Sequence, residues 1–303
     1  MCGIAGIMYK GSDSRFELGK DLIQMLAGCQ HRGKDSSGFA LYDAPAEGQL
    51  RFRFFAGVDA EAKQTIDDVK NVLKDLNAEI VSEEAAGGTY RMIVTFDGPI
   101  QKFSYAVEHA ATVSSIGTSL DIIKDIGTAE EVDERFDVQS RKGTHGVGHV
   151  RMATESDVTP EAAHPFWATG FADIAIVHNG QITNYWKMRR RLEQQGFEFR
   201  TENDSELIAV FLAEKLSKSI PLLRALEYSI EELDGSFSFL VSTKDEIGYA
   251  KDRLAVKPMV LYETADLVAI ASEEVSLNRL FPGKMLDTNE PLPGTFNTWS
   301  KSI

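Results

Sequence analysis

The chain opens with Met1-Cys2-Gly3-Ile4-Ala5-Gly6-Ile7, a short apolar stretch in which a cysteine follows the initiator methionine. Such a run predicts a buried strand, and its glycines allow neighbouring backbones to approach closely. Once Met1 is removed, Cys2 carries both a thiol and a free α-amino group, whose ordinary pKa is about 8. One residue then supplies a nucleophile and its base, as covalent catalysis requires. Position alone favours a small apolar residue in an edge strand, so the rest of the chain must decide.

Composition and charge narrow the class of protein. The chain has 303 residues, 43% of them hydrophobic, which is enough for one large domain or two small ones with a substantial core. Its formal charge of -14 argues against nucleic acid or an anionic membrane as a main partner, because both attract clustered Lys and Arg. No apolar run reaches the roughly 18 residues that a membrane-spanning helix needs.

The two cysteines, Cys2 and Cys29, have no spacing typical of a disulfide framework or of a cysteine metal site. This usage fits a reducing compartment. The N-terminal stretch also lacks the basic region and the length of a secretory signal peptide. We therefore expect a cytoplasmic protein without a resident cofactor or metal.

The apolar spacing predicts an α+β fold of short, mainly antiparallel strands and grouped helices. Helical periodicity runs over Leu18–Gln30, and Thr183 is the expected cap of a helix that reaches about Gln195. Strands are expected over Gly146–Thr154 and Ile174–Val177, and the second should end in a turn at Asn179-Gly180. Further helices are expected over 206–216 and 221–233, and further strands over 236–242, 247–251, 259–262 and 267–271.

The middle of the chain differs in character. Residues 57–140 contain 17 Asp and Glu against 7 Lys and Arg, which gives -10 of the total charge of -14. Helical periodicity over Ala60–Leu76 precedes two strand-like runs around Gly87-Gly88. We interpret residues 50–143 as an acidic α+β subdomain inserted into a domain that spans residues 1–303. A structural elaboration is favoured over an effector site, with a docking surface for a basic partner between the two.

Several residues together would suit hydrolysis of a small amide such as glutamine. Asn179 and the backbone N–H of Gly180 are candidates for an oxyanion hole. Arg151 is a candidate for bidentate binding of a carboxylate, and Asp204 for an ammonium group. Each residue alone has a more ordinary interpretation as a turn, an ion-pair partner or a helix cap. Their combination with Cys2 favours catalysis.

Six sequence blocks occur in the order found in class II glutamine amidotransferases, and the chain resembles the N-terminal-nucleophile glutaminase domain of that family over residues 2–49 and 144–280. The blocks are Cys2-Gly3-Ile4-Ala5-Gly6, His31-Arg32-Gly33-Lys34-Asp35-Ser36-Ser37-Gly38, Gly148-His149-Val150-Arg151-Met152-Ala153-Thr154, His178-Asn179-Gly180-Gln181-Ile182-Thr183-Asn184-Tyr185, Asn203-Asp204-Ser205-Glu206 and Asp234-Gly235-Ser236-Phe237. Lys34 and Met152 depart from the usual proline and aromatic residue of their blocks, which affects the subfamily more than the mechanism.

The resemblance implies a four-layer αββα sandwich of the Ntn-hydrolase type, with two mainly antiparallel sheets between helix layers. It also implies that Cys2, with its freed amine as base, attacks L-glutamine. The roles that the resemblance carries over are the oxyanion hole for Asn179 and Gly180, and substrate binding for Arg151, Asp204, Arg32 and Thr154.

The resemblance also bears on partners. Only some 20 residues follow the glutaminase region, so ammonia is expected to pass to a separate polypeptide. The length resembles the small subunits of glutamate-synthase-like or N-methylglutamate-synthase-like complexes, whose other subunits bind flavin and iron-sulfur clusters. The chain has no cysteine cluster for such a cofactor itself.

Other functions remain open from the sequence. The chain could be a catalytically silent regulatory or scaffold subunit of the same fold, although the intact Cys2 set argues against this. His145 and His149 suggest a metal hydrolase, but the surrounding glycines favour a strand and no acidic residue completes a ligand set. A glutaminase acting on another small amide is the third alternative.

Overall fold

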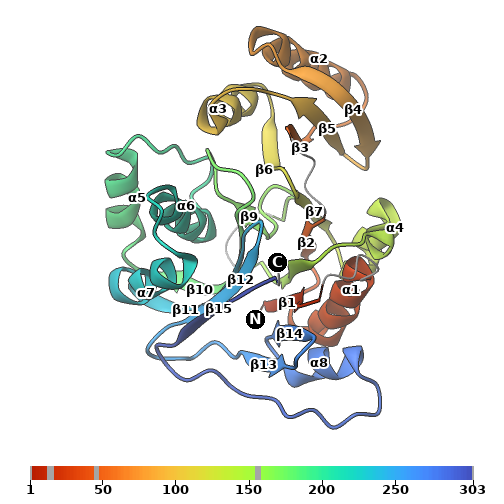
Figure 1. Ribbon diagram of the computed structural model, residues 1–303. Coiled ribbons are helices and arrows are strands. Elements are labelled where there is room, and N and C mark those ends of the chain that lie inside the picture. The colour runs from red at the N-terminus through yellow and green to blue at the C-terminus, as the bar shows by residue number, and fades with distance from the viewer. Residues whose placement is uncertain (1, 12–16, 44–47, 154–157, 302–303) are drawn as a thin grey trace.

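The structure is a computed structural model that describes residues 2–11, 17–43, 48–153 and 158–301. Figure 1 shows two large sheets in the lower part of the molecule and a smaller sheet above them. All strand pairs among the described residues are antiparallel. The predicted α+β class with antiparallel sheets is confirmed.

The first large sheet has six strands and contains the N-terminal strand β1. Along β1, Ile4 and Met8 point into the core between the sheets, whereas Ala5 and Ile7 point to the covering helices. This alternation follows from the two-residue period of a strand, and a buried strand at the N-terminus is confirmed. The strands in spatial order are β13 (Val260–Glu263), β14 (Leu267–Ala271), β1 (Gly3–Tyr9), β8 (His145–Arg151), β2 (Ser36–Tyr42) and β7 (Leu120–Ile126).

The second large sheet has five strands and faces the first. Val177 and Leu240 contribute to the core between the sheets, and their neighbours Ile176 and Val241 pack against the helices behind. The strands in order are β15 (Phe296–Ser300), β12 (Glu246–Lys251), β11 (Gly235–Ser242), β10 (Ala175–Ile182) and β9 (Phe166–Trp167).

Helices cover the outer side of each large sheet and complete four layers. The first sheet is covered by α1 (Leu18–Cys29), α4 (Ala129–Phe136) and α8 (Glu274–Leu280), which share one hydrophobic cluster with it. The second is covered by α5 (Tyr185–Glu193), α6 (Asp204–Ser217) and α7 (Leu222–Glu232). The αββα arrangement is therefore present. The predicted cap Thr183 is wrong, because α5 begins one residue later than expected: Asn184 occupies the cap position, and its carbonyl accepts from the Met188 N–H.

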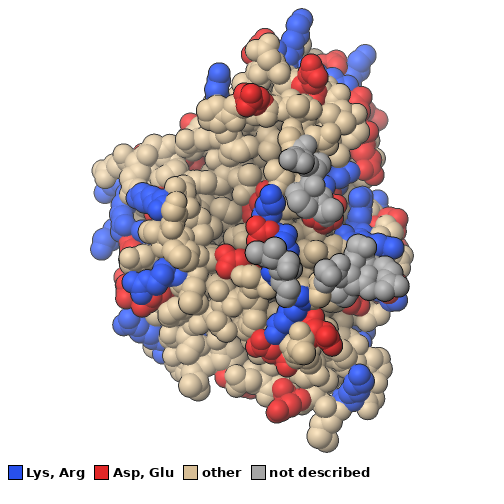
Figure 2. Space-filling view, in the orientation of Figure 1, with Lys and Arg blue, Asp and Glu red and all other residues tan. Residues whose placement is uncertain are grey.

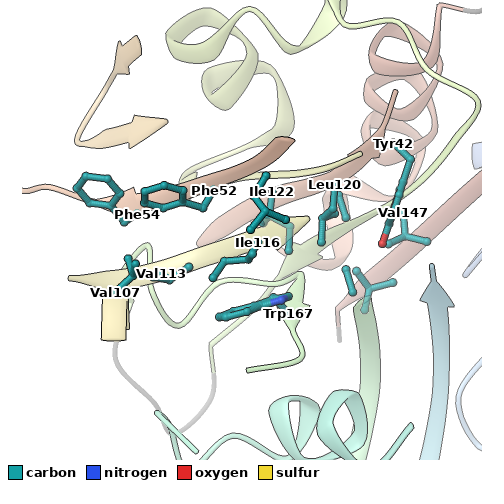
Figure 3. Close-up of a cluster of buried hydrophobic side chains, with 14 of the residues drawn as sticks. Tyr42, Phe52, Phe54, Val107, Val113, Ile116, Leu120, Ile122, Val147 and Trp167 are labelled. Carbon is teal, nitrogen blue, oxygen red and sulfur yellow. The ribbon is translucent and has the colours of Figure 1, made fainter. Parts of the chain in front are cut away.

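A third sheet forms the upper unit in Figure 1. Its strands in order are β4 (Glu79–Ala86), β5 (Thr89–Thr95), β3 (Gln49–Phe55) and β6 (Thr112–Gly117), with α2 (Asp59–Asp75) and α3 (Ile100–Ala110). The range 50–143 is thus divided in the structure, because β7 pairs with β2 in the main sheet and α4 packs on α1. Figure 3 shows Phe52 and Phe54 of this unit in line with Leu120 and Ile122 of β7, so the upper unit and the main body share one core.

Charge is distributed unevenly over the visible face. Figure 2 shows acidic side chains along the upper right of the molecule, over the region of β4 and β5 in Figure 1. The outer strand β4 is exposed along nearly its whole length and carries Glu79, Glu83 and Glu84. Within the described ranges, no helix is both long and apolar enough to cross a membrane.

Candidate active site

Cys2 lies immediately before β1 and lines a cavity of about 320 Å³ that receives residues from both large sheets. The carbonyl oxygen of Cys2 accepts hydrogen bonds from Arg32 Nε at 2.9 Å and from Asn179 Nδ2 at 3.0 Å. The Met152 backbone N–H lies 3.4 Å from Cys2 Sγ. The main chain of Cys2 is therefore fixed from two sides while its side chain borders the cavity.

Arg32 ends a short 3₁₀ turn, Gln30–Arg32, that follows α1. Its side chain is buried and forms an ion pair with Glu273 in addition to its bond to Cys2. A guanidinium group suits this double task because it carries several donors in a fixed plane. In this geometry, Arg32 lines the cavity and holds Cys2 in position through its carbonyl oxygen.

Arg151 is the last residue of β8, the strand beside β1, and it is buried at the cavity. The loop after Arg32 packs directly on its backbone. A Cβ at Gly33 would lie 2.3 Å from the carbonyl carbon of Arg151, so only glycine fits there. The N–H of Asp35 donates to the Arg151 carbonyl at 3.0 Å. The turn-rich block 31–38 thus places Arg151 next to Cys2.

Asn179 and Gly180 lie inside β10 and not in the turn that the sequence predicts. The strand continues to Ile182 because Gly180 adopts φ +145, which keeps the pairing with β11. A Cβ at Gly180 would lie 2.0 Å from the Ser236 carbonyl oxygen. This position therefore requires glycine for both conformation and space. The Asn179 side chain reaches across to Cys2 in the other sheet.

Asp204 is the first residue of α6, and the cap of this helix is its neighbour Asn203, whose side chain accepts from the Ser205 N–H at 2.8 Å. The Asp204 carboxylate is therefore not needed to cap the helix and can line the cavity. It accepts from the Ile182 N–H at 3.0 Å and lies 3.4 Å from His178 Nδ1. Burial would raise the pKa of Asp204, but His178 and the backbone N–H groups outweigh burial and lower it. Asp204 is therefore ionised at neutral pH.

One cavity thus brings together Cys2, Arg32, Arg151, Asn179, Gly180 and Asp204. These residues come from segments that are far apart in the chain. Thr154, the remaining predicted substrate-binding residue, lies outside the described residues. The cavity is lined by a thiol, a guanidinium group, a carboxylate and a side-chain amide. These are the groups that amide hydrolysis of a zwitterionic substrate needs.

Comparison with known proteins gives the family. Residues 149–279 match the model of a glutamine amidotransferase domain. A "Putative glutamine amidotransferase" of Methanothermobacter thermautotrophicus is 38% identical over 96% of this chain and 95% of its own length. A glutamine amidotransferase-like protein of Rhizobium meliloti is 36% identical over 99% of this chain and 98% of its own. The chain belongs to the class II glutamine amidotransferases.

A solved structure supports the fold of this amidotransferase. An allosteric regulatory enzyme of purine biosynthesis aligns with 99% of this chain and 47% of its own length, with a TM-score of 0.64 and 21% identity. At that identity, the likeness concerns the fold alone. The predicted Ntn-hydrolase type of sandwich is confirmed by it together with the four layers.

The cavity of this amidotransferase also contains residues that the sequence did not single out. The Ser205 hydroxyl lies between His164 Nε2 at 2.7 Å and His178 Nδ1 at 3.2 Å. His178 in turn contacts Asp204, so the group orients the carboxylate. His178 and Ser205 lie within the matching sequence blocks, which is the signal that could have found them. His164 lies outside the blocks, and its place at the cavity becomes visible only in the fold.

The two histidines that suggested a metal hydrolase lie in different surroundings in this amidotransferase. His149 stacks on His164 with ring centroids 4.1 Å apart, whereas His145 stacks on Tyr42 at 4.4 Å. Burial lowers the pKa of His149 to about 3 and that of His145 to about 4. Among the described residues, no group of three or more His, Cys, Asp or Glu side chains is arranged to hold a metal ion.

Proposed function

We propose that this amidotransferase hydrolyses L-glutamine to L-glutamate and ammonia, with Cys2 as the nucleophile. The observation that carries the proposal is that Cys2, Arg151, Asn179 and Asp204 line one cavity. Arg151 is assigned the α-carboxylate of glutamine and Asp204 its α-ammonium group. Because the two partners have opposite charge, they fix which end of the substrate lies where.

The chemistry follows from the groups around Cys2. After loss of Met1, the α-amine of Cys2 takes the thiol proton, and the thiolate attacks the amide carbon of glutamine. The amide oxygen becomes an oxyanion, which Asn179 Nδ2 and the Gly180 N–H stabilise. The ammonium then returns the proton to the amide nitrogen, the C–N bond breaks, and ammonia leaves. Water, deprotonated by the same amine, hydrolyses the thioester and releases glutamate.

Trapping with a diazo-ketone analogue of glutamine tests the nucleophile and the substrate class together. We expect one label per chain on Cys2, located by mass spectrometry, and protection by L-glutamine. Cys29 is the internal control, because burial raises the pKa of its thiol to about 11 and leaves little thiolate. Label on Cys29 alone would refute the mechanism. Absence of ammonia release by the wild-type chain, alone and with partners, would favour the silent scaffold.

The mass of the active protein tests the base. We expect it to lack Met1, since only then is the α-amine of Cys2 free. A fully active protein that retains Met1 would require another base, and the assignment of the amine would be wrong.

We further propose that the ammonia passes to a separate synthase subunit, one that carries flavin and iron-sulfur clusters as in glutamate-synthase-like or N-methylglutamate-synthase-like complexes. The two relatives that match over almost their whole length support delivery to another chain. By contrast, the amidophosphoribosyltransferase of Methanocaldococcus jannaschii is 32% identical over 57% of this chain and matches over only 37% of its own length.

The loop 252–258 offers a surface for that subunit. Lys257 and Pro258 of this loop line the catalytic cavity, and on the same loop Leu254 and Val256 are 71% and 61% exposed. Exposed apolar side chains beside a cavity are typical of a protein interface. Continuity with the cavity favours the synthase as the occupant, because ammonia then leaves directly into the partner.

Affinity purification from the native host tests delivery. We expect the tagged wild-type chain to recover subunits with flavin and iron-sulfur absorbance, and Leu254→Asp to recover much less of them while glutaminase activity persists. Met285→Asp, at a fully exposed apolar residue outside this loop, makes the same change of charge and should recover the subunits normally. Recovery of the chain alone, or equal recovery with Leu254→Asp, would contradict the delivery route.

A further inference from the structure

A second cavity, of about 310 Å³, lies where the upper unit meets the main body. It is bounded by β6 and α3 on one side and by β7, β9 and the start of α6 on the other. None of the residues assigned to glutamine lines it. The charged residues that line it are Glu108, Lys124, Glu161, Arg200 and Glu206.

Lys124 is a buried amine on which the carboxylates of Glu161 and Glu206 act only from beyond ion-pair distance. Its Nζ donates to the carbonyls of Glu161 at 3.0 Å and Ala163 at 2.8 Å and lies 4.7 Å from the centre of the Phe166 ring. No carboxylate among the described residues lies within ion-pair distance of it. Burial lowers the pKa of Lys124 to about 7, as expected for an ammonium group removed from water. An anion in the cavity would stabilise its charged form.

Glu108 is a buried carboxyl group whose negative charge is only partly compensated. Its side chain is only 3% exposed, and its single ion-pair partner among the described residues is Arg200, at 2.9 Å from Nε. Burial raises the pKa of Glu108 to about 7 in spite of Arg200. The guanidinium group of Arg200 also pairs with Glu198, so it does not fully compensate the buried carboxylate of Glu108. A cation in the cavity would therefore stabilise the charged form of Glu108.

Glu206, by comparison, is already satisfied and serves the fold. One of its oxygens accepts from Thr169 Oγ1 and the Arg200 N–H, and the other from the N–H and hydroxyl of Thr201. With four donors, this carboxylate has no acceptor capacity in reserve. Glu161 and Arg200 also line the cavity, but Glu161 holds Lys124 through its backbone carbonyl, and Arg200 is already paired with Glu108 and Glu198. The buried groups that a ligand could compensate are thus the amine of Lys124 and the carboxyl of Glu108.

We propose that this cavity binds a free α-amino acid, with its carboxylate beside Lys124 and its ammonium group beside Glu108. A simple anion would come close to Glu108 and Glu206, and a simple cation close to Lys124 and Arg200. Only a zwitterion supplies both missing counter-charges at once. The volume agrees, because the cavity is nearly as large as the one assigned to glutamine. Phe166, Trp167 and Val113 provide an apolar wall for the side chain.

The two cavities share a wall. Ser205 lines the catalytic cavity and its neighbour Glu206 lines the second one. Likewise, His164 lines the first cavity and stacks edge to face on Phe166 of the second. Lys124 holds the carbonyl of Ala163, directly before His164. A ligand that changes the position of Lys124 therefore acts on the segment that carries His164.

Fluorescence of Trp167 tests binding directly. The chain has three tryptophans, so Trp186→Phe with Trp299→Phe leaves Trp167 as the only reporter. We titrate this protein with each common amino acid, and with acetate and methylammonium as probes that carry one charge each. We expect a saturable change with at least one amino acid, and binding of acetate and methylammonium about tenfold weaker or more, because each lacks one charged partner. Calorimetry detects any binding that leaves the fluorescence unchanged.

Variants locate the site. Glu108→Gln and Lys124→Met preserve volume, and each should weaken amino-acid binding about tenfold or more. Asp204→Asn in the catalytic cavity is the matched control and should change the midpoint by about twofold or less. The proposal is overturned if no amino acid binds by either method, if acetate binds as tightly, or if the midpoint responds to Asp204→Asn and not to Glu108→Gln. None of these readouts needs turnover, so they stand or fall independently of the glutaminase activity.

Discussion

The side-chain amide of Asn179 donates to the carbonyl oxygen of Cys2 across the space between the two large sheets, with 3.0 Å between Nδ2 and the oxygen. The Ser272 hydroxyl lies 3.4 Å from the same nitrogen and accepts from the Ile4 N–H at 2.9 Å. The start of β1 is thus fixed to β10 by side chains. The second hydrogen of Asn179 Nδ2 is therefore close to the nucleophile and can reach the oxyanion of the tetrahedral intermediate that forms when the Cys2 sulfur attacks the amide carbon.

Asn179→Ala should lower kcat for glutamine hydrolysis about 10²-fold to 10³-fold, because one oxyanion donor is lost. KM should change little, since the donor acts mainly on charge that develops in the transition state. Steady-state release of ammonia measures both constants. Ser272→Ala is the comparison, because it removes only the neighbour of the amide and should cost much less. A rise in KM at unchanged kcat in Asn179→Ala would contradict the role.

Arg151 and Asp204 should each affect one end of the substrate. Arg151→Lys is expected to raise KM for glutamine about tenfold or more, because the bidentate contact with the α-carboxylate is lost. Asp204→Asn should have a similar effect through the α-ammonium group. The matched substrates are 4-carbamoylbutanoate, which lacks the ammonium group, and 4-aminobutanamide, which lacks the α-carboxylate.

Discrimination between these substrates decides the assignment. Asp204→Asn should lose most of the wild type's preference for glutamine over 4-carbamoylbutanoate and keep its preference over 4-aminobutanamide. Arg151→Lys should show the reverse pattern. Equal loss of both preferences in each variant would mean that the two residues act on the cavity as a whole and not on separate ends.

Gly180→Ala should lower the free energy of unfolding by about 3 kcal/mol or more, because a Cβ there meets a backbone oxygen and the residue has positive φ. Gly196 is the matched control. It also has positive φ, but a Cβ there meets nothing within 4 Å. Gly196→Ala should therefore cost only about 1 kcal/mol from the backbone conformation. Urea unfolding of both variants measures the difference, and equal costs would contradict the close approach to Ser236.

Arg53 and Asp121 should hold the upper unit on the main sheet. Two 2.8 Å bonds join the guanidinium of Arg53 in β3 to the carboxylate of Asp121 in β7, and both side chains are buried. Burial would raise the pKa of Asp121, but Arg53, with smaller contributions from Arg91 and Arg141, outweighs it and keeps the pKa well below its usual range. Asp121→Asn should destabilise the protein by about 3 to 5 kcal/mol, because the Arg53 charge stays buried without its partner.

The double variant Arg53→Met with Asp121→Leu tests that explanation. It removes both charges and keeps apolar volume, so it should recover much of the stability that Asp121→Asn loses. Thermal unfolding of the wild type and the two variants gives the comparison. A double variant that is less stable than Asp121→Asn would show that the shape of the ion pair, and not the unpaired charge, accounts for the loss.

His145 should make the protein less stable in mild acid. Burial lowers its pKa from 6.5 to about 4, against the favourable Thr243 carbonyl, which lies 2.6 Å from Nε2. Between pH 6.5 and 4, the unfolded chain binds a proton at this residue and the folded chain does not. Its contribution to the free energy of unfolding therefore falls with falling pH, by up to about 1.4 kcal/mol per pH unit.

His145→Gln should remove that part of the slope, measured by urea unfolding at several pH values. His109→Gln is the matched control, because His109 is exposed on α3 and its replacement should leave the slope in place. If His145→Gln and the wild type lose stability in parallel between pH 6.5 and 4, His145 does not carry this pH dependence.

The sequence by itself determined the local elements and the chemical inventory. A short continuous apolar run marked β1, and a helical period marked α1, because those patterns depend only on near neighbours. The motif blocks marked Cys2, Arg151, Asn179 and Asp204, since their order along the chain is itself the signal. The four layers came from the resemblance, because short apolar strands do not say which of them pair.

The tertiary structure decided what depends on residues that are distant in sequence. Asn179-Gly180 looks like a turn locally, yet its pairing with β11 and the crowding by Ser236 keep it in a strand. β7 follows the upper unit in the chain but pairs with β2, and this closes the second cavity around Lys124 and Glu108. Long-range packing alone sets the burial of such groups, and burial is what gives a carboxyl or an amine its unusual pKa.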